Sequence, residues 1–345
     1  MNQTFVGCSL YHIYISILMA YEARRKGNTS LLIIIGDRVP GVETLVPGLK
    51  SLGVFDDVIA VKSYSLFTRF RKNIGTFNYL FNRRGALEKL FERENNIIES
   101  KHGFITNSQI NLFHVVRTRA YFLIKYPDNY FRMVEEGFST YMHKMPLSRY
   151  LKRRYLIRFP ILMGYDKQVK EVLVQHPERL KDPVLRRKAV KFELAQLQEA
   201  LLPEEKKDIL ECFLKGKVDY AARKKFLVIT QPLSEDKIIS EETKIAIYRK
   251  AIMTAAGKGY TVYLKTHPRE LTKYDAIFQN IRMIPQLFPI EILNLSDEFF
   301  FEAGFTVFSG SLENIKHVGH KIFLGRDILK TPEDFLNRDL ELMNS

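Results

Sequence analysis

The chain has 345 residues, a length that favours two domains over one. Its 53 lysines and arginines against 39 aspartates and glutamates give a formal net charge of +14, which indicates an acidic partner: nucleic acid, an anionic membrane surface or negatively charged small molecules. The sequence has no zinc-finger spacing and no RNP-like aromatic motif, which argues against specific nucleic-acid binding. Two cysteines, Cys8 and Cys212, do not make a disulfide framework and are typical of a reducing compartment.

We expect neither a signal peptide nor a membrane span in the N-terminal region. No basic segment precedes an apolar run there, and no small-residue cleavage site follows one. The most apolar early stretch, residues 10–21, is shorter than the roughly 20 residues that a spanning helix needs. The expected location is therefore the cytoplasm. Short basic clusters within residues 69–84 and at 152–154 would suit peripheral contact with the anionic inner face of the membrane.

The first half of the chain predicts an α/β domain over residues 1–150. The segment Leu31–Ile35 is a continuous apolar run, which is typical of a parallel strand covered on both faces. A strand, a helix and a further strand in this order open a doubly wound fold. The expected strands lie at residues 4–6, 31–35, 58–61, 104–106, 112–116 and 130–134, and the expected helices at 10–26 and within 63–101.

The second half predicts a helical connection, a second α/β domain and a terminal helix. Apolar residues recur at helical spacing between 184 and 202, and Pro203 fits the first position of a helix, so we expect residues 151–225 to be helical. Thr331 opens a capping box, which predicts a helix at 331–345. The simplest architecture is two Rossmann-like domains with a deep cleft between them. The second domain is expected over 226–330, with strands at 226–230, 261–264, 281–284, 306–308 and 321–324 and a helix at 241–256.

The strand predicted at 261–264 ends in basic side chains around Pro268, namely Lys265, His267 and Arg269. Ligands of α/β proteins bind outside the carboxyl ends of strands, and three basic groups there suit an anion such as a phosphate. In that role His267 would protonate or hydrogen-bond a leaving phosphate. A histidine that is satisfied within an X-Pro turn is the alternative, since the same dipeptide recurs at His176-Pro177 without site-like features nearby.

Two further features of the second domain suit a nucleotide. The segment Ser309-Gly310-Ser311 lies between an apolar strand and a helix start, where hydroxyls and backbone N–H groups can cradle a phosphate. A plain serine N-cap is the alternative. Glu291 is an acid within an otherwise apolar segment and therefore needs a partner, for which a ribose hydroxyl or a neighbouring lysine would serve.

Two sets of acids are candidates for a general base. The pair Glu135-Glu136 follows a predicted strand and is followed by Gly137. A carboxylate that is pressed against a second one and partly dehydrated has a raised pKa and can accept a proton. The alternative is a solvated acidic pair. Asp236 lies in the loop after the strand predicted at 226–230, either as an acid of the site or as a capping or surface acid.

The sequence lacks several motifs of nucleotide enzymes. It contains no Asp-x-Asp, no P-loop, no Gly-x-Gly-x-x-Gly after a strand and no cysteine–histidine metal cluster. We therefore expect neither a metal nor a cofactor. A nucleotide enzyme without a metal must neutralise phosphate with side chains and helix ends, which Lys265, His267, Ser309 and Ser311 would supply.

Taken together, these motifs resemble those of bacterial sialyltransferases. The segment Glu135-Glu136-Gly137 resembles their acid-acid-glycine motif, Lys265–Pro268 their His-Pro motif, and Ser309–Leu312 their Ser/Thr-rich motif. Glu291, after Pro289, looks like the acid that holds the cytidine ribose. Residues 5–12 and 231–236 look most like glycosyltransferase family 52, the lipooligosaccharide and capsule sialyltransferases.

The resemblance implies a GT-B-type fold and an inverting, metal-independent transfer of sialic acid. The implied donor is CMP-sialic acid, and the implied acceptor is a terminal sugar hydroxyl, commonly galactose, of a surface glycan such as lipooligosaccharide or capsule. His267 would assist departure of the phosphate. The base would be Glu135, which we favour, or Asp236.

The resemblance also implies which residues bind the substrates. Those on the nucleotide and phosphate are Lys265, Pro268, Glu291, Ser309, Gly310 and Ser311. Those on the acceptor side are Glu136 and Gly137. Gly310 departs from the family pattern, because it replaces the middle serine and removes one hydroxyl contact.

The implied partners are a nucleotide-sugar donor and a glycan or glycolipid acceptor, and a homodimer stays open. Two alternative functions stay open as well. One is a family relative that transfers a glucosyl or N-acetylhexosaminyl group from another nucleotide sugar. The other is a non-enzymatic basic protein that binds polyanions.

Overall fold

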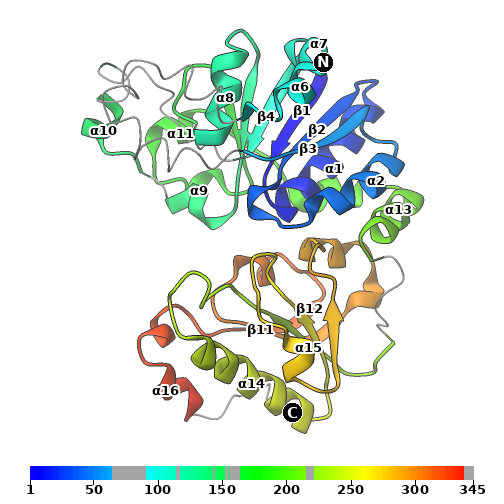
Figure 1. The fold of residues 1–345 in the computed structure, drawn as a ribbon, viewed down its shortest axis with the longest axis vertical. Coiled ribbons are helices and arrows are strands. Elements are labelled where there is room, and N and C mark those ends of the chain that lie inside the picture. The colour runs from blue at the N-terminus through cyan, green and yellow to red at the C-terminus, as the bar shows by residue number, and fades with distance from the viewer. Residues whose placement is uncertain are drawn as a thin grey trace. The chain divides into compact units, whose positions relative to one another are not determined.

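A computed structural model describes residues 1–63, 91–113, 117–142, 144–151, 155, 164–214 and 221–337. In this part of the chain the protein forms two α/β units, Met1–Leu201 and Leu202–Ser345, each built on its own parallel sheet (Figure 1). The basic clusters within residues 69–84 and at 152–154, which we expected to contact membrane, lie outside the described residues.

The sheet of the first unit has seven described strands in the order β3-β2-β1-β4-β5-β6-β7, and every neighbouring pair is parallel. Its central strands β2 and β4 are buried along their whole length, which explains the uninterrupted apolar run of β2. The strands are β1 (Asn2–Gly7), β2 (Ser30–Ile35), β3 (Asp57–Val61), β4 (Ser108–Phe113), β5 (Phe131–Val134), β6 (Val169–Val174) and β7 (Ala189–Lys191).

The helix α1 (Leu10–Arg25) packs against β1 and β2 and contacts α12 (Leu194–Glu199). It begins at Ser9, whose side-chain oxygen accepts the N–H of His12 at 3.2 Å. The other described helices of this unit are α2 (Val46–Ser51), α6 (Asn95–Glu99), α7 (His102–Thr106), α8 (Arg117–Lys125), α9 (Phe138–Met142), α10 (Leu147–Leu151) and α11 (Pro183–Arg187).

The strand predicted at 104–106 is wrong, and the strand predicted at 112–116 overlaps β4 at residues 112 and 113, while residues 114–116 lie outside the described residues. The first of these segments lies in α7, and the strand β4 begins only at Ser108. The start of β4 does not look like a buried strand in the sequence, because it contains polar residues. These residues are nevertheless buried, since they form hydrogen bonds with residues of β1. Ser108 Oγ lies 2.6 Å from Thr4 Oγ1, and Asn111 Nδ2 donates to Gln3 Oε1 at 2.8 Å. Hydrogen bonds between side chains of β4 and β1 thus allow polar residues in a buried strand, which usually has an apolar sequence.

The helical connection predicted over 151–225 is wrong as well, since β6 and β7 from this stretch belong to the first sheet. The helical spacing between 184 and 202 spans two short helices, α11 and α12, with β7 between them. A strand of three residues is too short to show an alternating pattern of its own. The helix predicted at Pro203 is present as α13 (Pro203–Leu214).

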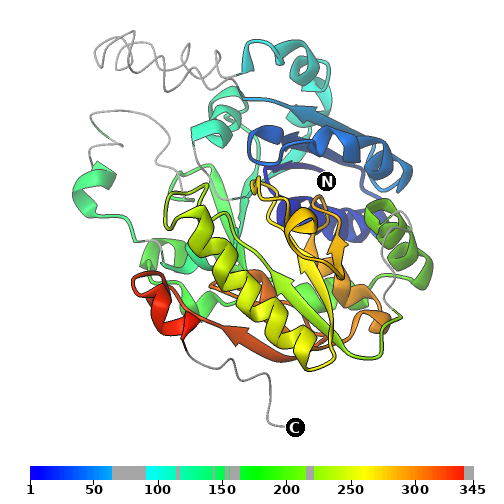
Figure 2. The same cartoon turned by 60° about the horizontal axis from the view of Figure 1, so that its bottom comes forward.

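The sheet of the second unit has five described strands in the order β10-β9-β8-β11-β12, and all neighbouring pairs are parallel. The long helix α14 (Glu241–Gly257) packs across β8 and β9 (Figure 2). The strands are β8 (Lys225–Ile229), β9 (Thr261–Lys265), β10 (Ile281–Ile284), β11 (Phe301–Thr306) and β12 (Val318–Phe323), and the remaining described helices are α15 (Tyr274–Ile277) and α16 (Pro332–Leu336).

Three boundaries in the second unit differ from those predicted. The strand expected at 306–308 is β11, which ends at Thr306, so residues 307 and 308 already belong to the following loop. The strand expected at 321–324 begins at Val318. The terminal helix is α16, and its Thr331 cap makes no side-chain hydrogen bond. Residues 338–345 of that predicted helix lie outside the described residues.

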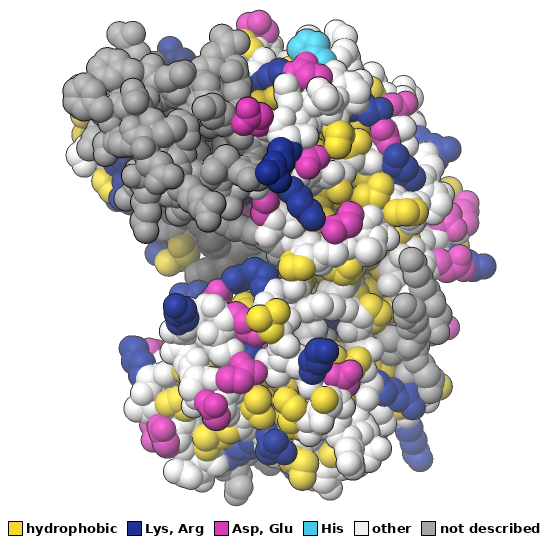
Figure 3. All heavy atoms as spheres, viewed as in Figure 1, with side chains coloured by type: hydrophobic (Ala, Val, Ile, Leu, Met, Phe, Trp, Pro, Cys, Tyr) yellow, Lys and Arg dark blue, Asp and Glu magenta, His cyan; other side chains and the backbone are white. Residues whose placement is uncertain are grey.

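The described part of the chain contains no helix that is both long and apolar enough to cross a membrane. Acidic and basic side chains are interspersed on the face drawn in Figure 3. The excess positive charge of the sequence is therefore not gathered into one patch on that described face.

Candidate active site

The strands β9, β8 and β11 lie side by side in the second unit and run in the same direction. Their carboxyl ends therefore meet at one edge of the sheet, where α/β proteins bind ligands. The loops after these strands carry Asp236, His267 and Ser309, which are three of the residues predicted to form the site. Gln231 joins two of these loops, because its side-chain oxygen accepts the backbone N–H of Phe308 at 2.8 Å.

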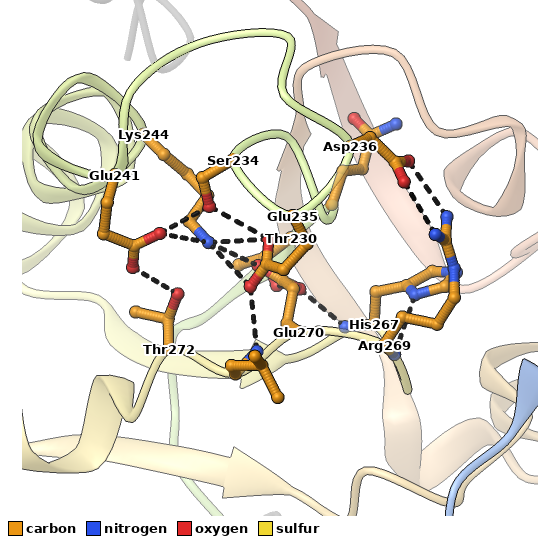
Figure 4. Close-up of polar contacts among 12 residues, drawn as sticks. Thr230, Ser234, Glu235, Asp236, Glu241, Lys244, His267, Arg269, Glu270 and Thr272 are labelled. Carbon is orange, nitrogen blue, oxygen red and sulfur yellow. Dashed lines mark hydrogen bonds and ion pairs between the residues drawn. The ribbon is translucent and has the colours of Figure 1, made fainter.

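His267 follows β9 and is half-buried. Its Nδ1 accepts the backbone N–H of Arg269 at 3.1 Å (Figure 4), so the proton of a neutral imidazole lies on Nε2. Burial, together with the positive charges of Arg269 and Lys265, lowers the pKa of His267 to about 4. At neutral pH this side chain is therefore an uncharged donor, and no hydrogen bond to Nε2 occurs among the described residues.

Arg269 and Asp236 form a bidentate ion pair next to this imidazole (Figure 4). The two bonds join Nη1 to Oδ1 at 2.7 Å and Nη2 to Oδ2 at 2.9 Å. The hydrogen bond to the guanidinium lowers the pKa of Asp236 below its ordinary value. This ion pair weakens Asp236 as a proton acceptor and neutralises the charge that Arg269 was predicted to offer an anion.

Lys265 is the last residue of β9 and is 5% exposed. Its ammonium donates to the carbonyl oxygens of Thr266 at 2.6 Å and Gln286 at 2.9 Å. Burial lowers the pKa of Lys265 to about 8, and the charges of Glu270 and Glu291 oppose this shift. Lys265 therefore contributes positive charge from the interior, while two of its three N–H donors bond to the backbone.

Glu291 lies in a 3₁₀ segment, Ile290–Leu295, and is 3% exposed. Burial raises the pKa of its carboxyl to about 7, against the lowering effects of its own backbone N–H and of the Lys265 charge. The sequence left two partners open for Glu291, a ribose hydroxyl or a neighbouring lysine. The structure provides the lysine, because the positive charge of Lys265 acts on the Glu291 carboxyl.

The segment Ser309-Gly310-Ser311 follows β11 and opens a single 3₁₀ turn, Gly310–Leu312. Ser309 is its N-cap, since its Oγ accepts the backbone N–H of Ser311 at 3.3 Å. The N-cap interpretation is thus correct for Ser309. A Cβ placed on Gly310 would meet no atom within 4 Å, so the position of the missing family serine is open.

Glu135 follows β5 at the carboxyl edge of the first sheet and is 1% exposed. It is not a solvated acid, because its carboxylate accepts hydrogen bonds from three separate segments of the unit. The donors are Tyr11 OH at 3.3 Å, Tyr141 OH, the Gln175 backbone N–H at 3.0 Å and Gln175 Nε2 at 2.6 Å. Glu136 is half-buried, and its backbone N–H donates to Thr140 Oγ1 at 3.0 Å.

We expect Gly137→Ala to lower the free energy of unfolding by about 1–3 kcal/mol, because Gly137 has a φ of +99°, where a side chain is strained. The matched control is Gly310→Ala, which also adds a methyl group to open space but at an ordinary φ. Chemical denaturation of both variants measures the difference. Equal effects at the two positions would contradict the assignment of strain to Gly137.

The chain matches a known family over most of its length. Residues 54–324 match the model of glycosyltransferase family 52. The chain belongs to glycosyltransferase family 52. This match confirms the resemblance to family 52 that the acid-acid-glycine, His-Pro and Ser/Thr-rich motifs of the sequence indicated.

The family 52 chain is also similar to individual proteins. An uncharacterized protein of Haemophilus influenzae is 32% identical over 184 residues, which are 52% of this chain and 57% of that protein, so the match spans little more than half of the relative. The UDP-GlcNAc 2-epimerase of Methanocaldococcus jannaschii is 14% identical, with a TM-score of 0.54 over 98% of this chain and 94% of that one. An α/β-galactoside α-2,3-sialyltransferase of Photobacterium phosphoreum is 14% identical, with a TM-score of 0.44 over 93% and 90%.

The predicted fold class of the family 52 chain is confirmed. Its two parallel α/β sheets are similar to the fold of the Methanocaldococcus jannaschii UDP-GlcNAc 2-epimerase. These structural similarities concern the fold alone. Among the described residues, no group of three or more histidine, cysteine, aspartate or glutamate side chains is placed to hold a metal ion.

Sequence reasoning missed two buried charges of the family 52 chain. Glu270 follows directly on the predicted site stretch, and Lys244 lies on α14. The signal for Lys244 was its position, since it lies three residues before Ile247 and seven before Ala251 on the buried side of that helix. A lysine in line with core residues must have carboxylate partners; Glu241 is three residues before it, whereas Glu235 and Glu270 come from other segments.

Proposed function

We propose that this chain is an inverting sialyltransferase that moves sialic acid from CMP-sialic acid to a terminal sugar hydroxyl of a surface glycan, with galactose as the foremost acceptor sugar. Membership of family 52 supports a nucleotide-sugar donor. The observation that carries the proposal is the neutral imidazole of His267, whose Nδ1 is held internally so that Nε2–H is available to a phosphate oxygen. It lies at the same sheet edge as Ser309 and Ser311.

In the proposed reaction, the bond between the sialic acid anomeric carbon and the phosphate oxygen breaks, and its electron pair leaves with cytidine monophosphate. His267 stabilises that developing charge by donating from Nε2, as a positioned hydrogen-bond donor does. Ser309, Gly310 and Ser311 bind the phosphate, with Pro268 shaping the turn. Glu291 accepts from the ribose, and Lys265 adds positive charge from the interior. These assignments rest on the family motifs and on the placement of the residues around one sheet edge.

We propose Glu135 as the base that takes the acceptor proton, with Glu136 and Gly137 on the acceptor side. Its partners are neutral donors, and the weakest is Tyr11 OH at 3.3 Å, which an acceptor hydroxyl can replace. Asp236 is the second candidate. It would have to leave its bidentate ion pair with Arg269 to accept a proton, which makes it the poorer base.

The direct test is a transfer assay with CMP-sialic acid and a lactose-type acceptor in the presence of EDTA. We expect sialylated product and free CMP in equal amounts, unchanged by the chelator. Absence of both transfer and donor hydrolysis would contradict the proposal. Loss of activity with EDTA would contradict its metal-independent form.

The second candidate is a family relative that uses another nucleotide sugar. Thermal unfolding with CMP and with UDP separates the two, because a ligand at 100 times its Kd stabilises by about 2.7 kcal/mol. We expect CMP alone to raise the Tm. A rise with UDP alone favours glucosyl or N-acetylhexosaminyl transfer. Polyanion binding that falls with salt, without any nucleotide preference, favours the non-enzymatic alternative.

We expect Gly310→Ser to tighten CMP binding by about twofold to tenfold, since one added hydrogen bond contributes about 0.5–1.5 kcal/mol. The added hydroxyl restores the middle serine of the family motif at a position with open space. Gly310→Ala is the matched control and should leave the Kd unchanged. Isothermal titration with CMP measures all three proteins, and equal affinities of the serine and alanine variants would contradict a phosphate contact at this position.

A further inference from the structure

Lys244 is a fully buried lysine whose ammonium lies among three carboxylates (Figure 4). Its Nζ is 3.1 Å and 3.0 Å from the two oxygens of Glu235, 2.9 Å from Glu241 Oε2 and 3.9 Å from Glu270 Oε1. A buried charge of this kind is tolerated only with close partners of opposite charge, so the cluster is held together as a unit.

The carboxylates around Lys244 join two loops of the site. Glu235 belongs to the loop after β8, and its Oε1 also accepts the backbone N–H of Leu271 in the turn after β9, at 2.8 Å. Glu241 accepts from Thr272 Oγ1 in the same turn at 2.6 Å. One ammonium therefore lies between the carboxylates through which the loop after β8 and the start of α14 are attached to the turn after β9.

Glu270 extends this attachment to the backbone of His267. Its Oε2 accepts the N–H of His267 at 2.8 Å and also the Thr230 hydroxyl, while Oε1 accepts Tyr274 OH at 2.9 Å. On the other side of the turn, the carbonyl of His267 accepts Gln286 Nε2 at 3.1 Å. Both backbone polar groups of the histidine are thus held, and a buried carboxylate holds one of them.

We propose that Lys244 and Glu270 are positioning residues that fix the turn of His267 and so aim its Nε2 at the donor phosphate. This inference rests on the proposed function for what the imidazole does, and on the geometry alone for how it is held. Lys244 has no exposed surface, so it acts through its carboxylate partners and not by contact with substrate. Removal of its charge leaves Glu235, Glu241 and Glu270 close together without a cation, which drives the two loops apart.

The experiment compares Lys244→Met with Lys250→Met, a matched change on the same helix. Lys250 Nζ donates to the carbonyls of Phe335 at 2.7 Å and Leu336 at 2.9 Å, so its loss removes a comparable lysine contact away from both loops. Two quantities are measured in each variant: the NMR titration of the His267 imidazole, and kcat for sialyl transfer. If Lys244→Met does not fold, Glu270→Gln replaces it in both measurements.

We expect the His267 pKa, about 4 in the native protein, to move toward the ordinary value of about 6.5 in Lys244→Met, with kcat at least tenfold lower. Lys250→Met should keep the native titration and a kcat within twofold. A folded Lys244→Met protein with the native titration overturns the inference, whatever its activity. If the titration moves but the native protein transfers no sialic acid, the positioning role stands and the proposed function fails.

Discussion

His267→Ala lowers kcat for sialyl transfer by about two orders of magnitude or more, the range expected for loss of a group that acts on the leaving phosphate. The reason is that Nδ1 of the imidazole accepts the backbone N–H of Arg269, so the ring proton lies on Nε2 and can be donated to the phosphate. Single-turnover and steady-state assays with CMP-sialic acid measure the change. We expect the Kd for CMP to change less than kcat, because the donor acts on charge that develops as the bond breaks.

The second His-Pro dipeptide supplies the matched control. The His176 side chain is 45% exposed, lies 3.3 Å from Glu178 and belongs to the first unit, so it is not part of the loops that carry the proposed phosphate site. We expect His176→Ala to keep kcat within twofold of the native value. Similar losses in the two alanine variants would show that the loss in His267→Ala is not specific to the leaving group.

The lowered pKa of His267 also predicts how kcat/KM depends on pH. Its depressed pKa of about 4 means that the neutral donor form prevails in the free protein down to that pH. We therefore expect His267 to add no step near 6.5 to kcat/KM, which reports the free enzyme, and to lower it only as the pH approaches 4. Because the Glu291 carboxyl has a pKa of about 7 and can add a limb of its own, the profile is measured in Glu291→Gln, where an acid limb near 6.5 would show that the imidazole titrates as an ordinary exposed histidine.

Glu135→Gln lowers kcat by about two orders of magnitude, since an amide cannot take the acceptor proton. The substitution also brings amide hydrogens toward the two N–H donors of Gln175, so we expect some loss of stability as well. Transfer assays and thermal unfolding on the same sample separate the two effects. Asp236→Asn should cost less than tenfold, because the native carboxylate is already paired with Arg269.

Glu171→Gln is the control for stability, since Glu171 pairs with Arg132 on the same sheet, with Nη2 and Oε2 at 2.7 Å. It should lower the Tm without a comparable loss of kcat. A larger loss of kcat in Asp236→Asn than in Glu135→Gln would move the role of base to the second unit.

Much of the fold could be predicted because the central strands are buried on both faces. The segment at 31–35 is a continuous apolar run, the segment at 261–264 is apolar after Thr261, and both are strands in the structure. Residues 108–111 of β4 were not predicted, because Ser108 and Asn111 bond to residues of β1, more than a hundred residues earlier in the chain. Local patterns cannot report a partner at that distance.

In the predicted site, too, residues placed by local patterns were predicted, and residues placed by contacts with distant segments were not. His267 and Ser309 are the residues that follow strands, so a parallel sheet brings them to one edge without further information. Glu270 and Lys244 are found only by their pairing in three dimensions, because each is individually an ordinary charged residue. The pairing of Asp236 with Arg269 was also not readable, and it changes the chemistry of an acid that the family motifs left as a candidate base.

The carboxylate of Glu135 has a consequence for how the first unit is assembled. Its donors come from Tyr11, 124 residues earlier, from Tyr141, six residues later, and from Gln175, 40 residues later. Contacts that join such distant segments close late in folding, because the chain must lose the entropy of long loops first. The proposed base thus takes its final surroundings only when the beginning and the end of the unit have already met, so a chain shortened at either side lacks part of them.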